Sequence, residues 1–153
     1  MIARSFGRTV LPIVAAALLL AIAERGDSAP RCYSVGRFQL VANDIFDGAT
    51  GLTWQQNVSA RPFTWSDAAT YCSTQPGGFR LPTFKELLSI VDYTKPASST
   101  IATINPVAFP NTPADLFWSS GAVTTAEAAA VSFIDSEGIP TDVSAALWVR
   151  CVR

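Results

Sequence analysis

The sequence predicts an α+β domain in which two short helices pack on a small antiparallel sheet, with the N- and C-terminal strands close together. Residues 64–91 contain two stretches with apolar side chains at helical spacing, separated by a Pro-Gly-Gly turn at residues 76–78. Short segments of alternating polarity, bounded by turn residues, lie on both sides of this helix pair. Strands that flank helices without regular strand–helix alternation indicate the α+β class.

The first 36 residues are predicted to lie outside this domain. Residues 1–23 have a basic start and an apolar stretch too short to span a bilayer comfortably, which is typical of a secretory signal peptide. We expect cleavage after Ala23 and export to the periplasm, the cell surface or the medium; a retained membrane anchor is the alternative. Residues 24–36 are predicted to form a flexible leader, and residues 37–153 a single domain.

The charge of the mature chain argues against two classes of partner. Removing Arg4 and Arg8 with the signal peptide leaves 9 of the 11 basic residues against 12 acidic ones, a net charge of about −3. The sequence contains no basic patch of the kind that binds nucleic acid. We therefore expect no nucleic-acid partner, and no membrane insertion after signal cleavage.

Residues 37–54 predict a β-hairpin. Phe38 and Leu40 occupy alternate positions, and the turn residues 47–51 separate them from a second apolar segment. Asp47 in this turn could bind a metal ion. A turn residue that bonds to its own backbone is the favoured hypothesis.

Both predicted helices carry start signals. Thr64 with Asp67, and Thr83 with Glu86, have the spacing of N-capping pairs. Glu86 as a catalytic acid is the alternative to this capping role. The predicted buried stripes have members at i, i+3, i+4 and i+7, and they are Trp65, Ala68, Ala69 and Cys72 in the first helix and Phe84, Leu87, Leu88 and Val91 in the second.

The second half of the chain predicts a long loop, residues 95–115, followed by strands at residues 117–120, 131–134 and 147–152. A proline-rich loop of this length in a small domain is usually functional or disordered. An alternative for the two loop asparagines is that they only shape turns near proline. The candidate ligand-binding residues at this loop are Asn105, Asn111, Asp115 and Trp118.

Three cysteines in an exported chain predict one disulfide and one remaining thiol. Cys72 completes the buried stripe of the first helix, and Cys151 shares one face of the last strand with Leu147 and Val149. Pairing Cys72 with Cys151 closes a loop of roughly 80 residues, worth ~4–5 kcal/mol by chain entropy. Cys32, in the leader, leaves two other pairings open.

The sequence contains no histidine, which excludes Ser-His-Asp and Cys-His nucleophiles and every histidine-based metal site. It also lacks a Gly-rich phosphate loop and a Cys-x-x-Cys motif. We expect no cofactor and no catalysis. Acidic residues on predicted turns could in principle form the carboxylate pair of a glycosidase, although solvated surface is the favoured hypothesis for Asp115, Asp135, Glu137 and Asp142.

Short motifs spread from about residue 37 to residue 153 carry a family resemblance. They lie at residues 47–55, 64–72, 80–87, 104–106, 109–110, 117–120 and 149–153. In these motifs and their order the chain resembles the Lcl C-terminal domain family, named for a bacterial collagen-like adhesin. The resemblance implies adhesion or glycan binding at the cell surface. Residues 135–138 depart from the aromatic-rich Asp-Phe-x-Asp-Gly pattern of that family.

The chain is also similar, more loosely, to the C-type lectin-like fold. In that fold a Trp-x-x-Ala-x-x-x-Cys helix is tied to a cysteine in the last strand, roles that Trp65, Ala68, Cys72 and Cys151 would fill. The Glu-Pro-Asn or Gln-Pro-Asp motif and the Trp-Asn-Asp motif of calcium-dependent lectins are missing. The similarity therefore implies the scaffold without the calcium site.

The leading hypothesis is an exported, non-catalytic recognition or adhesion domain whose partner is an extracellular glycan or another cell-surface component. One alternative is an enzyme on a scaffold like that of formylglycine-generating enzymes, which use paired active-site cysteines. Another is a structural surface subunit that forms oligomers through exposed edges or through Cys32.

We predict that the exported protein begins near Glu24, because the signal peptide pattern ends at Ala23. Intact mass spectrometry of the secreted or periplasmic fraction measures this N-terminus. A full-length product retained in the cytoplasm would contradict the prediction.

Overall fold

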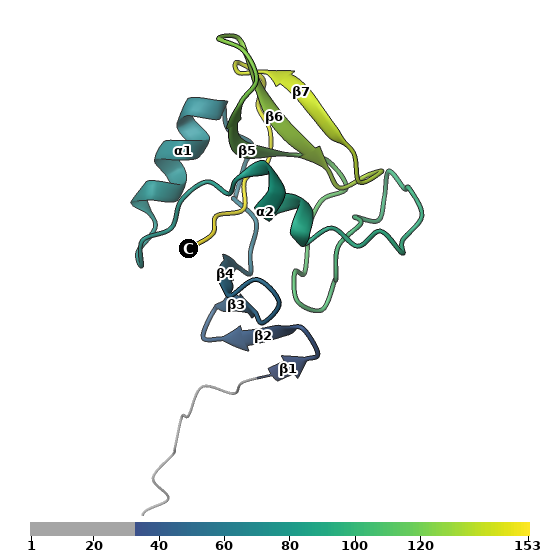
Figure 1. Ribbon diagram of the computed structural model, residues 1–153. Coiled ribbons are helices and arrows are strands. Elements are labelled where there is room, and N and C mark those ends of the chain that lie inside the picture. The colour runs from purple at the N-terminus through teal and green to yellow at the C-terminus, as the bar shows by residue number, and fades with distance from the viewer. Residues whose placement is uncertain (1–32) are drawn as a thin grey trace, which may run out of the picture.

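The computed structural model describes residues 33–153, and side chains from residue 36 onward. The predicted signal peptide, most of the predicted leader and Cys32 lie outside the described residues. Figure 1 shows a mixed α+β arrangement, which confirms the predicted class. One sheet lies at the bottom of the view and a second at the top, with the two helices and the C-terminal segment between and beside them.

The first sheet is an antiparallel meander that contains the predicted hairpin. Its strands pair in chain order, and the turn predicted at residues 47–51 joins the last two. A two-residue turn at residues 42–43, which we did not predict, divides the first half of the hairpin. Pairing also begins earlier than residue 37, inside the segment expected to be a leader. The strands are β1 (Tyr33–Val35), β2 (Phe38–Val41), β3 (Asp44–Asp47) and β4 (Leu52–Gln55).

Asp47 is a buried turn residue, as the favoured hypothesis stated. Its carboxylate accepts hydrogen bonds from the Ala49 amide (3.0 Å) and the Thr50 hydroxyl (2.7 Å), and it forms an ion pair with Arg37. Burial alone would raise the pKa of Asp47, but the hydrogen bonds from Arg37, Thr50 and Ala49 outweigh it and lower the pKa below its usual value. These contacts lock the β3–β4 turn.

Helix α1 (Trp65–Thr74) begins at its predicted N-cap, where the Thr64 side chain accepts a hydrogen bond from the Asp67 amide. Ala68 and Cys72 are buried, but Ala69 is exposed, so the predicted stripe was too wide. The reason is that α1 lies at the edge of the molecule (Figure 1), and the side chains that it buries in the core cluster are those of Ala68 and Cys72.

Helix α2 (Phe84–Ser89) begins with the predicted capping box. The Thr83 hydroxyl accepts from the Glu86 amide, and the Glu86 carboxylate accepts from the Thr83 amide at 2.8 Å. Arg80 donates two further hydrogen bonds to the same carboxylate, at 2.8 and 2.7 Å. These bonds, above all those from Arg80, lower the pKa of Glu86 to about 2. Glu86 is therefore a structural carboxylate, as the favoured hypothesis stated.

The second sheet consists of β5 (Leu116–Ala122), β6 (Glu127–Ser132) and β7 (Gly138–Asp142), antiparallel in chain order. β5 and β6 contain or overlap the strands expected at residues 117–120 and 131–134. Strand β7 was not predicted from the sequence. This strand lies at the exposed edge of the sheet, where Pro140 opposite Ala129 is tolerated and no apolar alternation is required.

Residues 147–152 were predicted as a strand. They form an extended segment that makes isolated β-bridges, each of a single residue pair, with four separate regions of the chain. Leu147 pairs with Phe63, Trp148 with Phe117, and Val152 with both Trp54 and Arg80. The pairing with Trp54 brings the C-terminal segment beside the first sheet, as predicted. The predicted alternation is confirmed: Leu147, Val149 and Cys151 lie in the core cluster that includes Cys72, whereas Trp148 and Val152 pack with the cluster that includes Leu87.

The predicted disulfide between Cys72 and Cys151 is present. The two Cα atoms lie 5.4 Å apart, and both residues are fully buried. The bond ties α1 to the C-terminal segment across 79 residues of sequence, and its chain-entropy contribution is ~4–5 kcal/mol. It fixes the geometry of everything packed between those two elements.

We predict that Glu86→Gln makes stability less sensitive to acid. The folded-state pKa of Glu86 is about 2, below its ordinary value of 4.5, so the contribution of the carboxylate is complete above pH 4.5 and is lost as the pH falls toward 2. Thermal unfolding of both proteins at pH 7 and pH 3 should show the wild-type advantage shrinking at pH 3. Glu137→Gln, at an exposed turn, is the matched control. A wild-type advantage that stays constant with pH would contradict the assignment.

Candidate functional site

The two asparagines predicted to bind a ligand are turn residues in the structure. The Asn105 side-chain oxygen accepts hydrogen bonds from the amides of Val107 (2.9 Å) and Ala108 (3.1 Å). Asn111 has a φ of 57°, in the left-handed region that asparagine tolerates. It lines a small cavity of about 200 Å³ with Ile104 and Phe109. Both asparagines thus have the turn-shaping role given as the alternative.

Asp115 and Trp118 are also tied to the fold. Asp115 is exposed, and its carboxylate accepts hydrogen bonds from its neighbour's amide, Leu116 (2.7 Å), and from the Trp148 indole (3.2 Å). Trp118 is fully buried, and its indole donates to the Phe63 carbonyl at 2.8 Å. The ring belongs to the core cluster that α1 and the C-terminal segment form against β5.

A larger groove of about 510 Å³ lies between the first sheet and the C-terminal end of α1. Its volume falls within the ~300–1,000 Å³ of typical ligand pockets. We call it the amide groove, because many of its lining side chains are primary amides. The β2–β3 turn contributes Ala42, Asn43 and Asp44; the end of β4 and the residues after it contribute Gln55, Gln56, Asn57 and Val58; α1 and the loop after it contribute Tyr71, Gln75, Pro76 and Phe79.

Two of the amides join opposite walls of the groove. The Gln55 side-chain nitrogen donates to the Gln75 side-chain oxygen at 3.3 Å, and the Gln55 oxygen accepts from the Cys151 amide at 3.2 Å. The Gln75 side-chain nitrogen in turn donates to the Tyr71 carbonyl at 3.2 Å. These hydrogen bonds connect both walls of the groove to the disulfide-bonded C-terminal segment.

Three other amides remain available to a ligand. Within residues 33–153, the side chains of Asn43, Gln56 and Asn57 form no hydrogen bond, and Asn43 and Asn57 are exposed. Each amide offers two donor hydrogens and one acceptor oxygen. Tyr71 adds an aromatic wall, with its ring stacked on Phe63 at 4.8 Å between centroids.

Arg150 holds the backbone behind these amides. Its guanidinium donates to the carbonyl oxygens of Gln55 (2.8 Å) and Gln56, and to the Thr112 hydroxyl (2.7 Å), and it lies 4.7 Å from the centre of the Phe109 ring. Complete burial lowers the pKa of Arg150 to about 9, so the group is still cationic at neutral pH. Among the described residues no carboxylate pairs with it, and neutral oxygens and a ring face stabilise the charge.

The chemistry of the groove is that of neutral hydrogen bonding. Its charged lining residue, Asp44, is paired with Arg153 at 2.9 Å. Within residues 33–153, no three side chains of the metal-ligating types gather at one place. None of the helices in that same part of the chain is long and apolar enough to cross a membrane.

The amide groove was not predicted from the sequence. The run Gln55, Gln56, Asn57 at the end of a predicted strand was the available signal. Three consecutive amides there look like ordinary solvated surface until the β2–β3 turn and α1 are placed beside them.

Backbone strain at Ala42 marks the rim of the groove. Ala42 has a φ of 58°, a region that alanine rarely occupies, and it is the first of the two turn residues between Val41 and Asp44. Strained backbone is concentrated at functional sites. At Ala42 the strain comes from the two-residue β2–β3 turn, which forms part of the groove wall.

We predict that Ala42→Gly stabilises the domain by about 1 kcal/mol. Glycine removes ~1–2 kcal/mol of left-handed strain, and its greater freedom in the unfolded chain offsets ~0.4–1 kcal/mol of that gain. Urea unfolding measures the change. The control is Ala49→Gly, at a turn position without positive φ, which should lower stability slightly. An unchanged or lower stability of Ala42→Gly would show that the turn carries no strain.

Comparison with family models gives a match to the Lcl C-terminal domain over residues 43–153. The matched range includes every residue that lines the amide groove except Ala42. A search of curated proteins gives no match. Because the matched range covers well over half of the sequence, the chain belongs to the Lcl C-terminal domain family.

Proposed function

We propose that the chain is an exported, non-catalytic recognition domain that binds a glycan in the amide groove. The observation that carries the proposal is the set of unbonded amides at Asn43, Gln56 and Asn57 beside the ring of Tyr71. Sugar hydroxyls both donate and accept hydrogen bonds, which side-chain amides match. Aromatic rings offer an apolar surface to the C–H groups of a sugar.

The bracing of the groove supports this proposal. Gln55 and Gln75 connect its walls, the disulfide holds α1 against the C-terminal segment, and Arg150 fixes the backbone of residues 55–56. A site that is already ordered loses little conformational entropy when a ligand binds. Weak individual hydrogen bonds to sugar hydroxyls can then add up to useful affinity.

We further propose that binding needs no calcium. Asp44, the acidic residue of the groove, is engaged by Arg153, and the sequence lacks the calcium motifs of lectins. A lectin-like scaffold remains part of the proposal, supported by a Trp-x-x-Ala-x-x-x-Cys helix bonded through Cys72 to Cys151 of the final segment.

The disulfide supports an exported location, because such bonds persist mainly in oxidising compartments. An exported domain would in turn meet a cell-surface partner. The same bond disfavours the enzyme alternative, since it occupies both Cys72 and Cys151. The structural-subunit alternative is favoured by exposed apolar side chains in and just before the long loop: Ile101 is 62% exposed and Tyr93 is 65% exposed. A mass from light scattering that rises with protein concentration would support that alternative.

We predict that Gln56→Ala and Asn57→Ala each weaken glycan binding about 3- to 10-fold, since each removes hydrogen bonds worth ~0.5–1.5 kcal/mol. A glycan array on residues 24–153 identifies the ligand, and isothermal titration then measures affinity with calcium and with chelator, which should give equal values. Melting temperatures should stay close to wild type.

The matched control is Asn111→Gly, which removes an amide side chain outside the groove and, unlike alanine, tolerates the φ of 57° at this position. Loss of binding in the control, with unchanged binding in both groove variants, would move the site to the long loop. Binding that requires calcium would contradict the calcium-independent site.

A further inference from the structure

We propose that the amide groove selects uncharged glycans over sulfated or carboxylated ones, because its charged lining residue is an acid held by its own counter-ion, Arg153. This inference rests on the proposed glycan-binding function and specifies the ligand class of that same site. The charged side chains in and around the groove support it, and they are Asp44, Arg153, Arg61 and Arg150.

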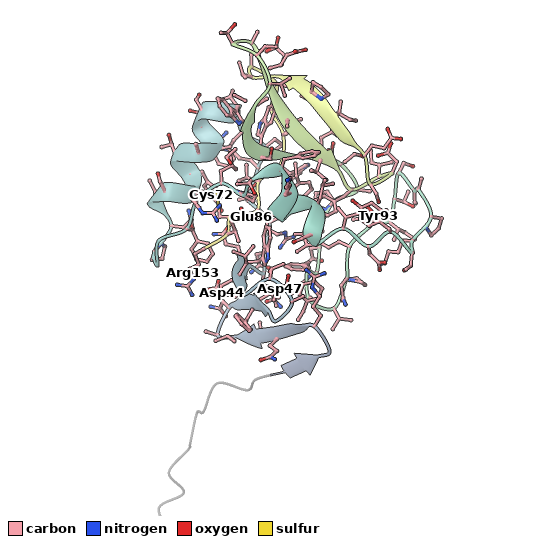
Figure 2. The ribbon with its side chains drawn as sticks, in the orientation of Figure 1. Asp44, Asp47, Cys72, Glu86, Tyr93 and Arg153 are labelled. Atoms are coloured by element: carbon pink, nitrogen blue, oxygen red, sulfur yellow. A yellow bond between two sulfur atoms is a disulfide. The ribbon has the colours of Figure 1, made fainter. Side chains whose placement is uncertain are left out.

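The lining itself offers no free cation. Of the eleven described residues that line the groove, Asp44 alone carries a charge. Its carboxylate is bonded to the Arg153 guanidinium at 2.9 Å, and Figure 2 shows the two side chains together below Cys72. An incoming sulfate or carboxylate would therefore meet a carboxylate oxygen rather than a cation.

Arg153 is held in place by contacts in addition to Asp44. Its second terminal nitrogen donates to the Gly77 carbonyl at 3.2 Å, and its guanidinium lies 4.9 Å from the centre of the Phe79 ring. A side chain at position 77 would collide with it, since a Cβ there would lie 2.4 Å from that nitrogen. Arg153 therefore cannot turn toward a ligand without giving up several contacts at once.

Two further cations of the described residues, Arg61 and Arg150, are bonded elsewhere. Arg61 lies over the Phe63 ring, 4.2 Å from its centre, and donates to the Pro62 carbonyl. Arg150 is fully buried behind the groove, where its two terminal nitrogens face protein oxygens. Neither side chain lines the groove, so neither can pair with an anion inside it.

The free groups suit neutral sugars. Asn43, Gln56 and Asn57 present both donors and acceptors, which match hydroxyl and N-acetyl groups. An anionic group needs donors alone and gains most from cations in a fork geometry. Among the described residues, the groove therefore discriminates because its lining holds no free cation and because Asp44 is present.

The test is a comparison of affinities by isothermal titration of the mature protein at physiological salt. The neutral probes are chitotetraose and tetrasaccharides of glucose, mannose and galactose; the anionic probes are a heparin-derived tetrasaccharide and a tetragalacturonate. We expect at least one neutral probe to bind ten times more tightly than either anionic probe. Asp44→Asn removes the one negative charge of the groove lining and leaves the Arg153 charge beside it uncompensated. The ratio of neutral to sulfated affinity should then fall about fivefold, with the change reduced at high salt.

The matched variant is Arg153→Gln, which leaves Asp44 without its counter-ion and should not lower that ratio. Tighter binding of an anionic probe to wild type, weakened 3- to 10-fold in Asn57→Ala, would overturn the selectivity while the glycan site itself stands. An affinity ratio that does not move in Asp44→Asn would overturn the role of the ion pair. No binding of any probe, in titration or on an array, would overturn the proposed function and this inference together.

Discussion

The last seven residues of the chain form an extended segment that satisfies backbone groups on both of its sides. Along one side it exchanges hydrogen bonds with Thr53, Gln55 and Phe63; along the other it bonds to Arg80 and to β5. Buried peptide groups must find partners, so without this segment both sheets and the linker between them would each have an unpaired edge. The disulfide at Cys151 then fixes α1, which this ladder of hydrogen bonds does not reach.

Arg150 shows how the same segment shapes the groove. A buried cation without a carboxylate carries a desolvation cost that a well-packed apolar residue would avoid. The structure places it where two carbonyl oxygens of residues 55–56 converge, beside Thr112 and the Phe109 ring. An apolar side chain could fill that volume but could not hold those carbonyls. The arrangement thus favours a fixed loop at the groove over maximal stability.

Local signals predicted the parts of the fold that local chemistry determines. Both helix caps, the Asp47 turn and the face of Cys151 follow from side chains within a few residues of each other, and all were confirmed. The edge strand β7 lacks apolar alternation, and the burial of Trp118 depends on the C-terminal segment that covers it. Three distant segments build the groove, so none of its amides is distinguishable from solvated surface in the sequence.

The position of the groove also follows from what the long loop does. Binding residues are commonly found on long loops carried by a rigid scaffold, and that expectation placed the candidates at residues 105–118. The loop instead supplies core side chains, with Ile104, Ala108 and Phe109 all fully buried. Its turns are therefore committed to packing. The groove lies where short turns meet α1, and the bonds that define its walls, from the Cys151 amide through Gln55 to Gln75, start from the disulfide itself. Stability and site geometry consequently depend on one set of contacts, so a change that loosens the C-terminal segment must alter both.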